Sequence, residues 1–168
     1  FDEAYVYDMQ EIISDIKAEY KTTEPNLSIE IVKGDLPEKV MDLGVQEGII
    51  RAIYAAQNGV YRMSADMADL VETSNNIARV VIKDGEILVG CLTRSSVESS
   101  KFDLANSLRS AFELVGCEVE LSGSYPGWTP NVNSEILEVL KAIYEKQNGE
   151  QPKVVACHAG LECGILGT

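Results

Sequence analysis

The stretch VETSNNIARVVIKDGEILVGCLT (residues 71–93) decides the fold of this chain. It contains two β-rich runs separated by Lys83-Asp84-Gly85-Glu86, and Asp-Gly is a typical sequence of a tight two-residue hairpin turn. Strands joined by such a turn are antiparallel, because parallel neighbours need a long crossover connection. The sequence therefore predicts an antiparallel pair over residues 71–82 and 87–93.

Helices and shorter strands are expected on both sides of this hairpin. Apolar residues at helical spacing predict helices over residues 1–20, 37–57, 99–114 and 134–148. Alternating or apolar runs predict further strands over residues 27–32, 60–63, 117–121 and 152–156. The predicted fold class is α+β: an antiparallel sheet with helices packed on one face, as in ferredoxin-like domains, followed by a short α/β segment.

A change of character near residue 123 predicts a domain boundary. Residues 123–130 form a loop rich in Gly and Pro that holds the only tryptophan, Trp128. The capped helix and the apolar strand that follow suit a strand buried on both faces, as in an α/β layout. We therefore expect one domain over residues 1–123 and a portion of a second over residues 124–168.

Composition excludes several kinds of partner. The chain has 168 residues and a formal net charge of −13, so nucleic acid and anionic membrane surfaces are not expected to bind it. No apolar run is long enough to cross a bilayer. None of the four cysteines forms a C-x-x-C pair, which favours reduced thiols and a cytoplasmic location.

The segment from Cys157 to Gly164 carries the densest group of reactive side chains. His158 is the only histidine, and Glu162 follows four residues later, on the same face if the segment is helical. A catalytic zinc typically needs three protein ligands, so three interpretations remain open: a metal site, substrate binding, and a merely structural role. A thiol nucleophile at Cys157 or Cys163 is a further alternative. Cys157 is disfavoured because adjacent strand residues point to opposite faces.

Polar residues in the hairpin form a second candidate site. Asn76 lies within the first strand and Arg94 ends the second, so pairing brings them toward one surface. An arginine near amide groups is a natural clamp for a carboxylate. The alternative is a strand whose outer face is simply exposed to water.

Several motifs together resemble the Xaa-His dipeptidases, a family of co-catalytic zinc metallopeptidases also known as aminoacyl-histidine or cytosol non-specific dipeptidases (peptidase D type). The matching motifs lie in the family's order over roughly residues 50–166: Asn58-Gly59-Val60, Val71-Glu72-Thr73-Ser74 with Asn76, Cys91-Leu92-Thr93-Arg94-Ser95, Tyr125-Pro126-Gly127-Trp128 with Pro130 and Asn133-Ser134, and His158-Ala159-Gly160-Leu161-Glu162-Cys163-Gly164. The first fifty residues match only in general pattern.

The resemblance implies an assignment for each part of the chain. Residues 1–123 look like a portion of the family's lid domain, which grips substrate and often mediates homodimerisation. Residues 124–168 look like the point where the chain re-enters the catalytic domain. The family's His-x-Asp motif, bridging aspartate, glutamate pair and closing Gly-Pro-His-Ser-Pro motif are not found in this sequence. The zinc of the intact enzyme is therefore not expected here, and this piece alone is predicted to be inactive.

The resemblance also implies substrate-binding roles. Asn76 matches a lid asparagine near the scissile group, and Arg94 matches a lid arginine that meets the substrate carboxylate or the oxyanion. His158 and Glu162 match positions that shape the substrate pocket. The resemblance therefore implies a segment of a dipeptidase that acts on dipeptides, with Xaa-His dipeptides as the expected substrates. The alternative is a non-enzymatic α+β module for binding or dimerisation.

Overall fold

The computed structural model describes residues 3–158 and residue 165. The chain divides into two compact units, Phe1–Val40 and Met41–Thr168. The first unit contains helix α1 (Glu3–Glu19), whose half-buried Val6, Met9, Ile13 and Ile16 recur at helical spacing. Helix α1 confirms the predicted first helix.

The second unit contains a three-stranded antiparallel sheet in the order β1-β2-β3. Its strands are β1 (Gly59–Met63), β2 (Val71–Lys83) and β3 (Glu86–Ser95). The predicted hairpin joins β2 to β3, with Asp84 at φ 56° and Gly85 at φ 84°. Positive φ at both central residues is the geometry of a type I′ turn, whose twist matches that of the flanking strands.

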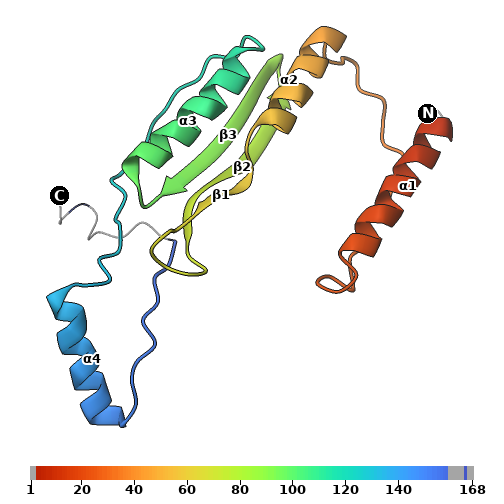
Figure 1. Cartoon of the computed structure of the whole chain (residues 1–168). Helices are drawn as coiled ribbons and strands as arrows, with labels where there is room; N and C mark the ends of the chain where they lie inside the picture. Colours follow the sequence, from red (N-terminus) through yellow and green to blue (C-terminus); the bar gives the residue numbers. More distant parts are fainter. Residues whose placement is uncertain (1–2, 159–164, 166–168) are drawn as a thin grey trace. The chain divides into compact units, whose positions relative to one another are not determined.

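Helices α2 (Leu43–Ala55) and α3 (Glu98–Glu113) lie on one face of the sheet (Figure 1). The core lies where the helices meet each other and the strands. Its buried apolar residues are Ile49, Ala52, Ala56, Leu104, Leu108 and Phe112, and sheet residues such as Ile77, Ile87 and Val89 pack against them. An antiparallel sheet covered by helices on one face confirms the predicted α+β class.

Helix α2 begins later than predicted. The sequence suggests a start near Pro37, but Asp42 is the N-cap: its Oδ1 accepts hydrogen bonds from the Gly44 and Val45 amides at 2.9 and 3.3 Å. An aspartate in this position satisfies amides that have no partner within the helix. The cap therefore decides where the helix starts.

Three predicted strands are wrong. Residues 27–32, 117–121 and 152–156 are not assigned to strands. Cys117 and Val119 still pack against the core. Val154 and Val155, predicted to be buried on both faces, are 41% and 68% exposed. A strand is defined by pairing with a neighbour, and no strand pairing is found for these segments among the described residues.

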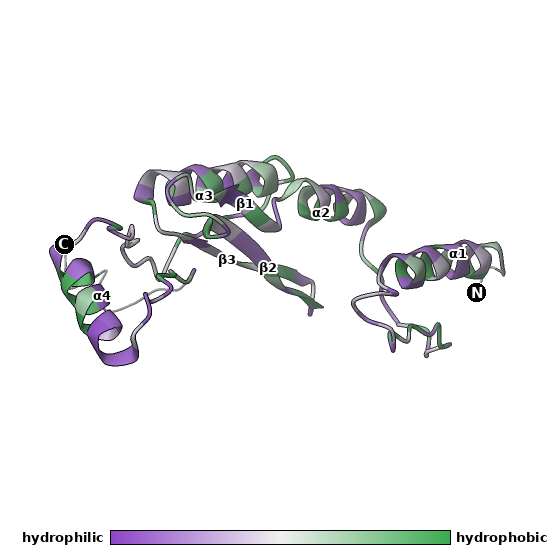
Figure 2. Ribbon diagram, turned by 60° about the horizontal axis from the view of Figure 1, so that its bottom comes forward, coloured by the Kyte–Doolittle hydropathy of each residue, from purple (hydrophilic) through white to green (hydrophobic). Residues whose placement is uncertain are grey.

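Helix α4 (Glu135–Asn148) follows the Gly-Pro-rich loop and is capped as predicted, by Ser134 at its start and by Gly149 at its end. None of its residues is buried. Ile136, Val139, Leu140 and Ile143 are all about half exposed or more, and hydrophobic and hydrophilic residues share the helix in Figure 2. An amphipathic helix usually buries its apolar face against a partner.

Candidate substrate-binding site

The candidate site lies where strand β2 begins and its hydrogen-bonded neighbour β3 ends. The register pairs Ser74 with Arg94 and Asn76 with Leu92. Cross-strand partners share a face of a sheet, and residues two apart on one strand also share a face. Ser74, Asn76 and Arg94 therefore lie on the same face, opposite the helices.

Residues between these positions face the helices and stabilise the strand ends. Thr73 is fully buried, and its hydroxyl is 2.8 Å from the hydroxyls of both Ser95 and Ser100. Asn75 is also buried, donating to the Gln57 carbonyl at 2.8 Å and accepting from the Thr93 hydroxyl at 3.0 Å. Buried polar groups need such partners. Exposure to water therefore does not explain all the polar residues of β2, because Thr73 and Asn75 are buried and hydrogen-bonded on the helix-facing side.

His158 contacts Ser74, the residue of β2 that pairs with Arg94 on β3. Its Nε2 atom is 2.8 Å from Ser74 Oγ, across 84 residues of sequence. Burial lowers the pKa of His158 below its ordinary value of 6.5, the positive charge of Arg94 lowers it further, and a hydrogen bond at the Val71 backbone opposes both. His158 is therefore neutral at pH 7, and the site gains no second positive charge there.

Arg94 is exposed, and no hydrogen bond or ion pair of its side chain is found within the described part of the chain. Lys101, the other cation nearby, is already engaged: its Nζ lies 2.7 Å from Glu98 Oε1 and 2.6 Å from the Tyr125 carbonyl. Arg94 is thus the cation available to an incoming anion.

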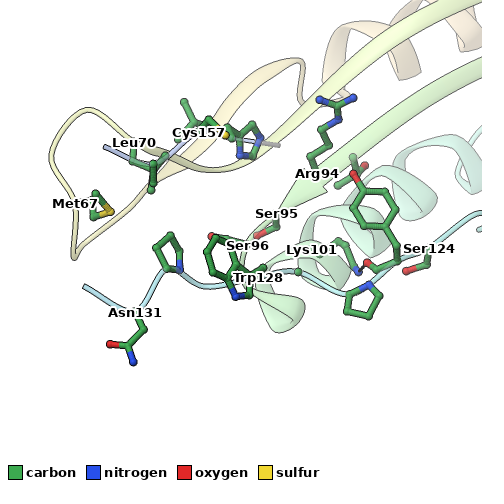
Figure 3. Close-up of a pocket in the computed structure, with 18 of the residues that line it drawn as sticks. Met67, Leu70, Arg94, Ser95, Ser96, Lys101, Ser124, Trp128, Asn131 and Cys157 are labelled. Carbon is green, nitrogen blue, oxygen red and sulfur yellow. Dashed lines mark hydrogen bonds between the residues drawn. The ribbon is translucent and has the colours of Figure 1, made fainter. Parts of the chain in front are cut away.

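A pocket of about 660 Å³ adjoins these residues. Arg94, Ser95, Ser96, Lys101, Trp128 and Cys157 surround it in Figure 3, and His158 also lines it. Most of its other walls are apolar, including Met67, Leu70 and Phe102. A largely apolar pocket with a few polar groups is typical of small-molecule sites.

The structure thus brings two of the four predicted residues, Arg94 and His158, to one pocket. Asn76 lies on the same sheet face as Arg94 but is not among the residues that line the pocket. Glu162 lies outside the described residues. Ser74 was not predicted, because its position opposite Arg94 depends on the register irregularity between Ile77 and Arg79, which the sequence pattern does not reveal.

Two alternative chemistries find little support in this geometry. The histidine ring contacts Ser74 and the Val71 backbone, so no described contact joins it to Cys157 as a base. Among residues 3–158 and 165, no group of three or more His, Cys, Asp and Glu side chains is placed to hold a metal ion. The resemblance implies a zinc centre for the intact enzyme, and these described residues do not supply a group of ligands for it.

None of the helices in the described ranges has the length and apolar character needed to cross a membrane. No protein-family model matches the sequence.

Comparison with known proteins finds dipeptidases that are similar to this chain in sequence and in structure. The chain is 33% identical over 153 residues to the cytosol non-specific dipeptidase of Escherichia coli (strain K12), a match that covers 82% of this chain and 32% of that protein. Its structure is similar to the crystal structure of aminoacylhistidine dipeptidase from Vibrio alginolyticus, with a TM-score of 0.91 and 32% identity over 97% of this chain and 33% of that one.

The chain therefore spans about a third of the length of each of these relatives. The sequence match and the structural match both point to the family that the motifs resemble. The chain is related to one segment of the peptidase D-type aminoacyl-histidine dipeptidases.

Proposed function

We propose that this chain supplies the substrate-binding side of a zinc-dependent dipeptidase and does not hold the metal centre. The observation that carries the proposal is the Arg94 guanidinium, which has no hydrogen-bond or ion-pair partner among the described residues, beside a neutral His158 at a largely apolar pocket. A guanidinium binds a carboxylate through two parallel hydrogen bonds. The apolar walls suit the side chains of a dipeptide.

Each predicted residue has a part in this proposal. Arg94 binds the substrate carboxylate or a developing oxyanion, and His158, held by Ser74, forms the adjoining wall. Asn76 on the same sheet face and Glu162 further along the chain complete the set by resemblance. We take dipeptides as the substrate class from the names of both relatives, and Xaa-His dipeptides from the name of the Vibrio alginolyticus enzyme.

The proposal includes an assignment of the chain to two domains. We assign residues 1–123 to the lid and residues 124–168 to the start of the catalytic domain, where two zinc ions of the intact enzyme would activate water and polarise the peptide carbonyl. The exposed apolar face of α4 and residues 153–156, for which no strand partner is found in the described ranges, suit a segment that packs against more of the catalytic domain. By the same resemblance we propose homodimerisation through the lid and a cytoplasmic location.

Binding of a dipeptide tests the proposal without requiring catalysis. Alanyl-histidine is titrated into the isotope-labelled 168-residue chain, and the shifts of the Arg94 and His158 resonances are followed by NMR. The same dipeptide with a C-terminal amide is the matched ligand, and Arg94→Gln is the matched variant. We expect binding that weakens about tenfold or more on loss of either partner, as for a charge-assisted hydrogen bond.

Arg79→Gln is the control variant, because Arg79 is an exposed arginine on the same hairpin, paired with Gly90 away from the pocket. Equal binding of acid and amide would refute the carboxylate role. Equal loss of binding in both arginine variants would show that only net charge matters.

The alternative, a non-enzymatic α+β module for binding or dimerisation, is favoured by the self-contained core of the second unit. It predicts that the coding sequence flanking this chain holds no His-x-Asp or Gly-Pro-His-Ser-Pro motif. The dipeptidase proposal predicts both.

A further inference from the structure

The Gly-Pro-rich loop is fastened to the start of helix α3 by a small group of polar contacts. Lys101 Nζ donates to Glu98 Oε1 and to the Tyr125 carbonyl. The same Glu98 oxygen accepts a hydrogen bond from the Gly127 amide at 2.5 Å. Two side chains from one helical turn therefore bind the backbone of the loop on both sides of Pro126.

Burial distinguishes this ion pair from an ordinary surface pair. Lys101 is only 9% exposed, and its ammonium also lies 5.3 Å from the ring centre of Phe102. A buried charge is costly unless it is paired and hydrogen-bonded. Because the Tyr125 carbonyl is one of its two oxygen partners, Lys101 is fully satisfied only while the loop stays in place.

Close packing at Gly127 independently indicates a fixed loop. A Cβ atom at this position would lie 2.7 Å from the Ser96 carbonyl oxygen and 2.8 Å from that of Ser95. Only glycine allows the backbone to approach so closely. The Thr129 hydroxyl adds a hydrogen bond of 2.9 Å to the same Ser96 carbonyl. The loop thus touches the end of β3, immediately after Arg94.

We propose that Glu98 and Lys101 are positioning residues that hold the Tyr125–Gly127 backbone on helix α3 and thereby set the wall that Trp128 contributes to the pocket, which Arg94 also lines. All of these residues line the pocket except Glu98, which acts through Lys101 and Gly127 (Figure 3). The proposal goes beyond the proposed function and holds whatever ligand the pocket takes.

Two probes in this chain report on the loop itself. Trp128 is the only tryptophan, so its fluorescence is specific to the loop. The Gly127 amide is bonded to Glu98, so its hydrogen exchange reports on that contact. We compare Glu98→Ala with Glu138→Ala, which removes the Glu138–Lys141 pair of the same i,i+3 spacing and a similar length of 2.8 Å on helix α4.

Glu98→Ala is expected to speed exchange of the Gly127 amide about tenfold or more and to raise acrylamide quenching of Trp128 by about twofold, because the loop opens locally. Glu138→Ala should change neither. Glu98→Gln retains an oxygen acceptor and should restore most of the protection. Lys101→Arg should preserve more of it than Lys101→Met.

Gly127→Ala disturbs the loop through a steric clash with the end of β3 and leaves Glu98 and Lys101 unchanged. It should raise Trp128 quenching as Glu98→Ala does, because the added Cβ cannot occupy the observed position. If Glu98→Ala behaves like Glu138→Ala, the positioning role is wrong. If it deprotects the core amides of α3 as much as Gly127, the pair only supports the helix and the proposal is equally refuted.

Discussion

At the scale of single residues, the site depends on a histidine that stays neutral beside an arginine. A protonated His158 would place two positive charges together in a half-buried site, which burial and Coulomb repulsion both oppose. Neutral imidazole keeps its hydrogen bond to Ser74 and leaves Arg94 as the charge that meets the ligand. The two residues therefore have separate roles, one positioning and one binding.

Removing the positive charge of Arg94 should raise the pKa of His158. In Arg94→Gln only the burial effect still lowers the pKa, so the titration midpoint moves up toward 6.5. His158 is the only histidine, so its ring-proton shift gives the midpoint directly by NMR. Arg79→Gln serves as the control, and an unchanged or lower midpoint in Arg94→Gln would contradict the placement of Arg94 beside the ring.

The contact of His158 with the sheet should weaken in acid. The pKa of His158 is lower in the folded chain than in the unfolded chain, so below 6.5 the unfolded state binds more protons. The stabilising contribution is present above 6.5 and is lost as the pH falls through the folded-state pKa. Thermal unfolding of wild type and His158→Gln should therefore differ most above pH 6.5 and differ less as the pH falls through the lowered pKa of His158. A gap that widens in acid would show the opposite sign.

At the scale of elements, local signals predicted the helices and the hairpin well. The residues Asp84-Gly85 specify a turn by their local backbone preference alone. Ser134 and Gly149 likewise specify the two ends of α4. The strands at 27–32, 117–121 and 152–156 were predicted wrongly because a strand depends on a partner, which a local pattern does not supply. Asp42 was missed as the cap of α2 because the apolar pattern continues upstream of it.

The hairpin was predictable from the sequence, but the register at the site was not. Counting from the turn would pair Ser74 with Ser95, and an irregularity in β2 between Ile77 and Arg79 shifts the register so that Ser74 pairs with Arg94. The contact of His158 with Ser74 joins residues 84 positions apart and needs the tertiary fold. The assignments of Asn76 and Glu162 rest on resemblance and stay predictions.

Gly85→Val should destabilise the hairpin. Gly85 has φ 84°, and a left-handed backbone conformation costs an L-residue about 1–2 kcal/mol of conformational free energy. Gly90→Ala in the same hairpin is the matched control, because an added Cβ would meet Arg79 Cβ at an ordinary 3.6 Å. Urea denaturation should separate the two variants by about that amount, and equal midpoints would argue against the turn as described.

At the scale of the whole molecule, the core of the second unit is small and centres on α3. Leu104 is fully buried, so Leu104→Ala should cost about 2–5 kcal/mol of unfolding free energy. Leu114, which follows the same helix, is 87% exposed, and Leu114→Ala should cost little. Similar losses in the two variants, measured by urea denaturation, would mean that the core lies elsewhere.

The central claim is that this chain carries the substrate-binding side of a dipeptidase without its metal centre. Metal content tests it most directly: the purified 168-residue chain is dialysed against buffered zinc and the bound metal is counted by mass spectrometry. We predict that no zinc is retained per chain, because the described residues offer no cluster of ligands. About two tightly held zinc ions, the number in a co-catalytic site, would contradict the claim and make the chain a candidate enzyme in its own right.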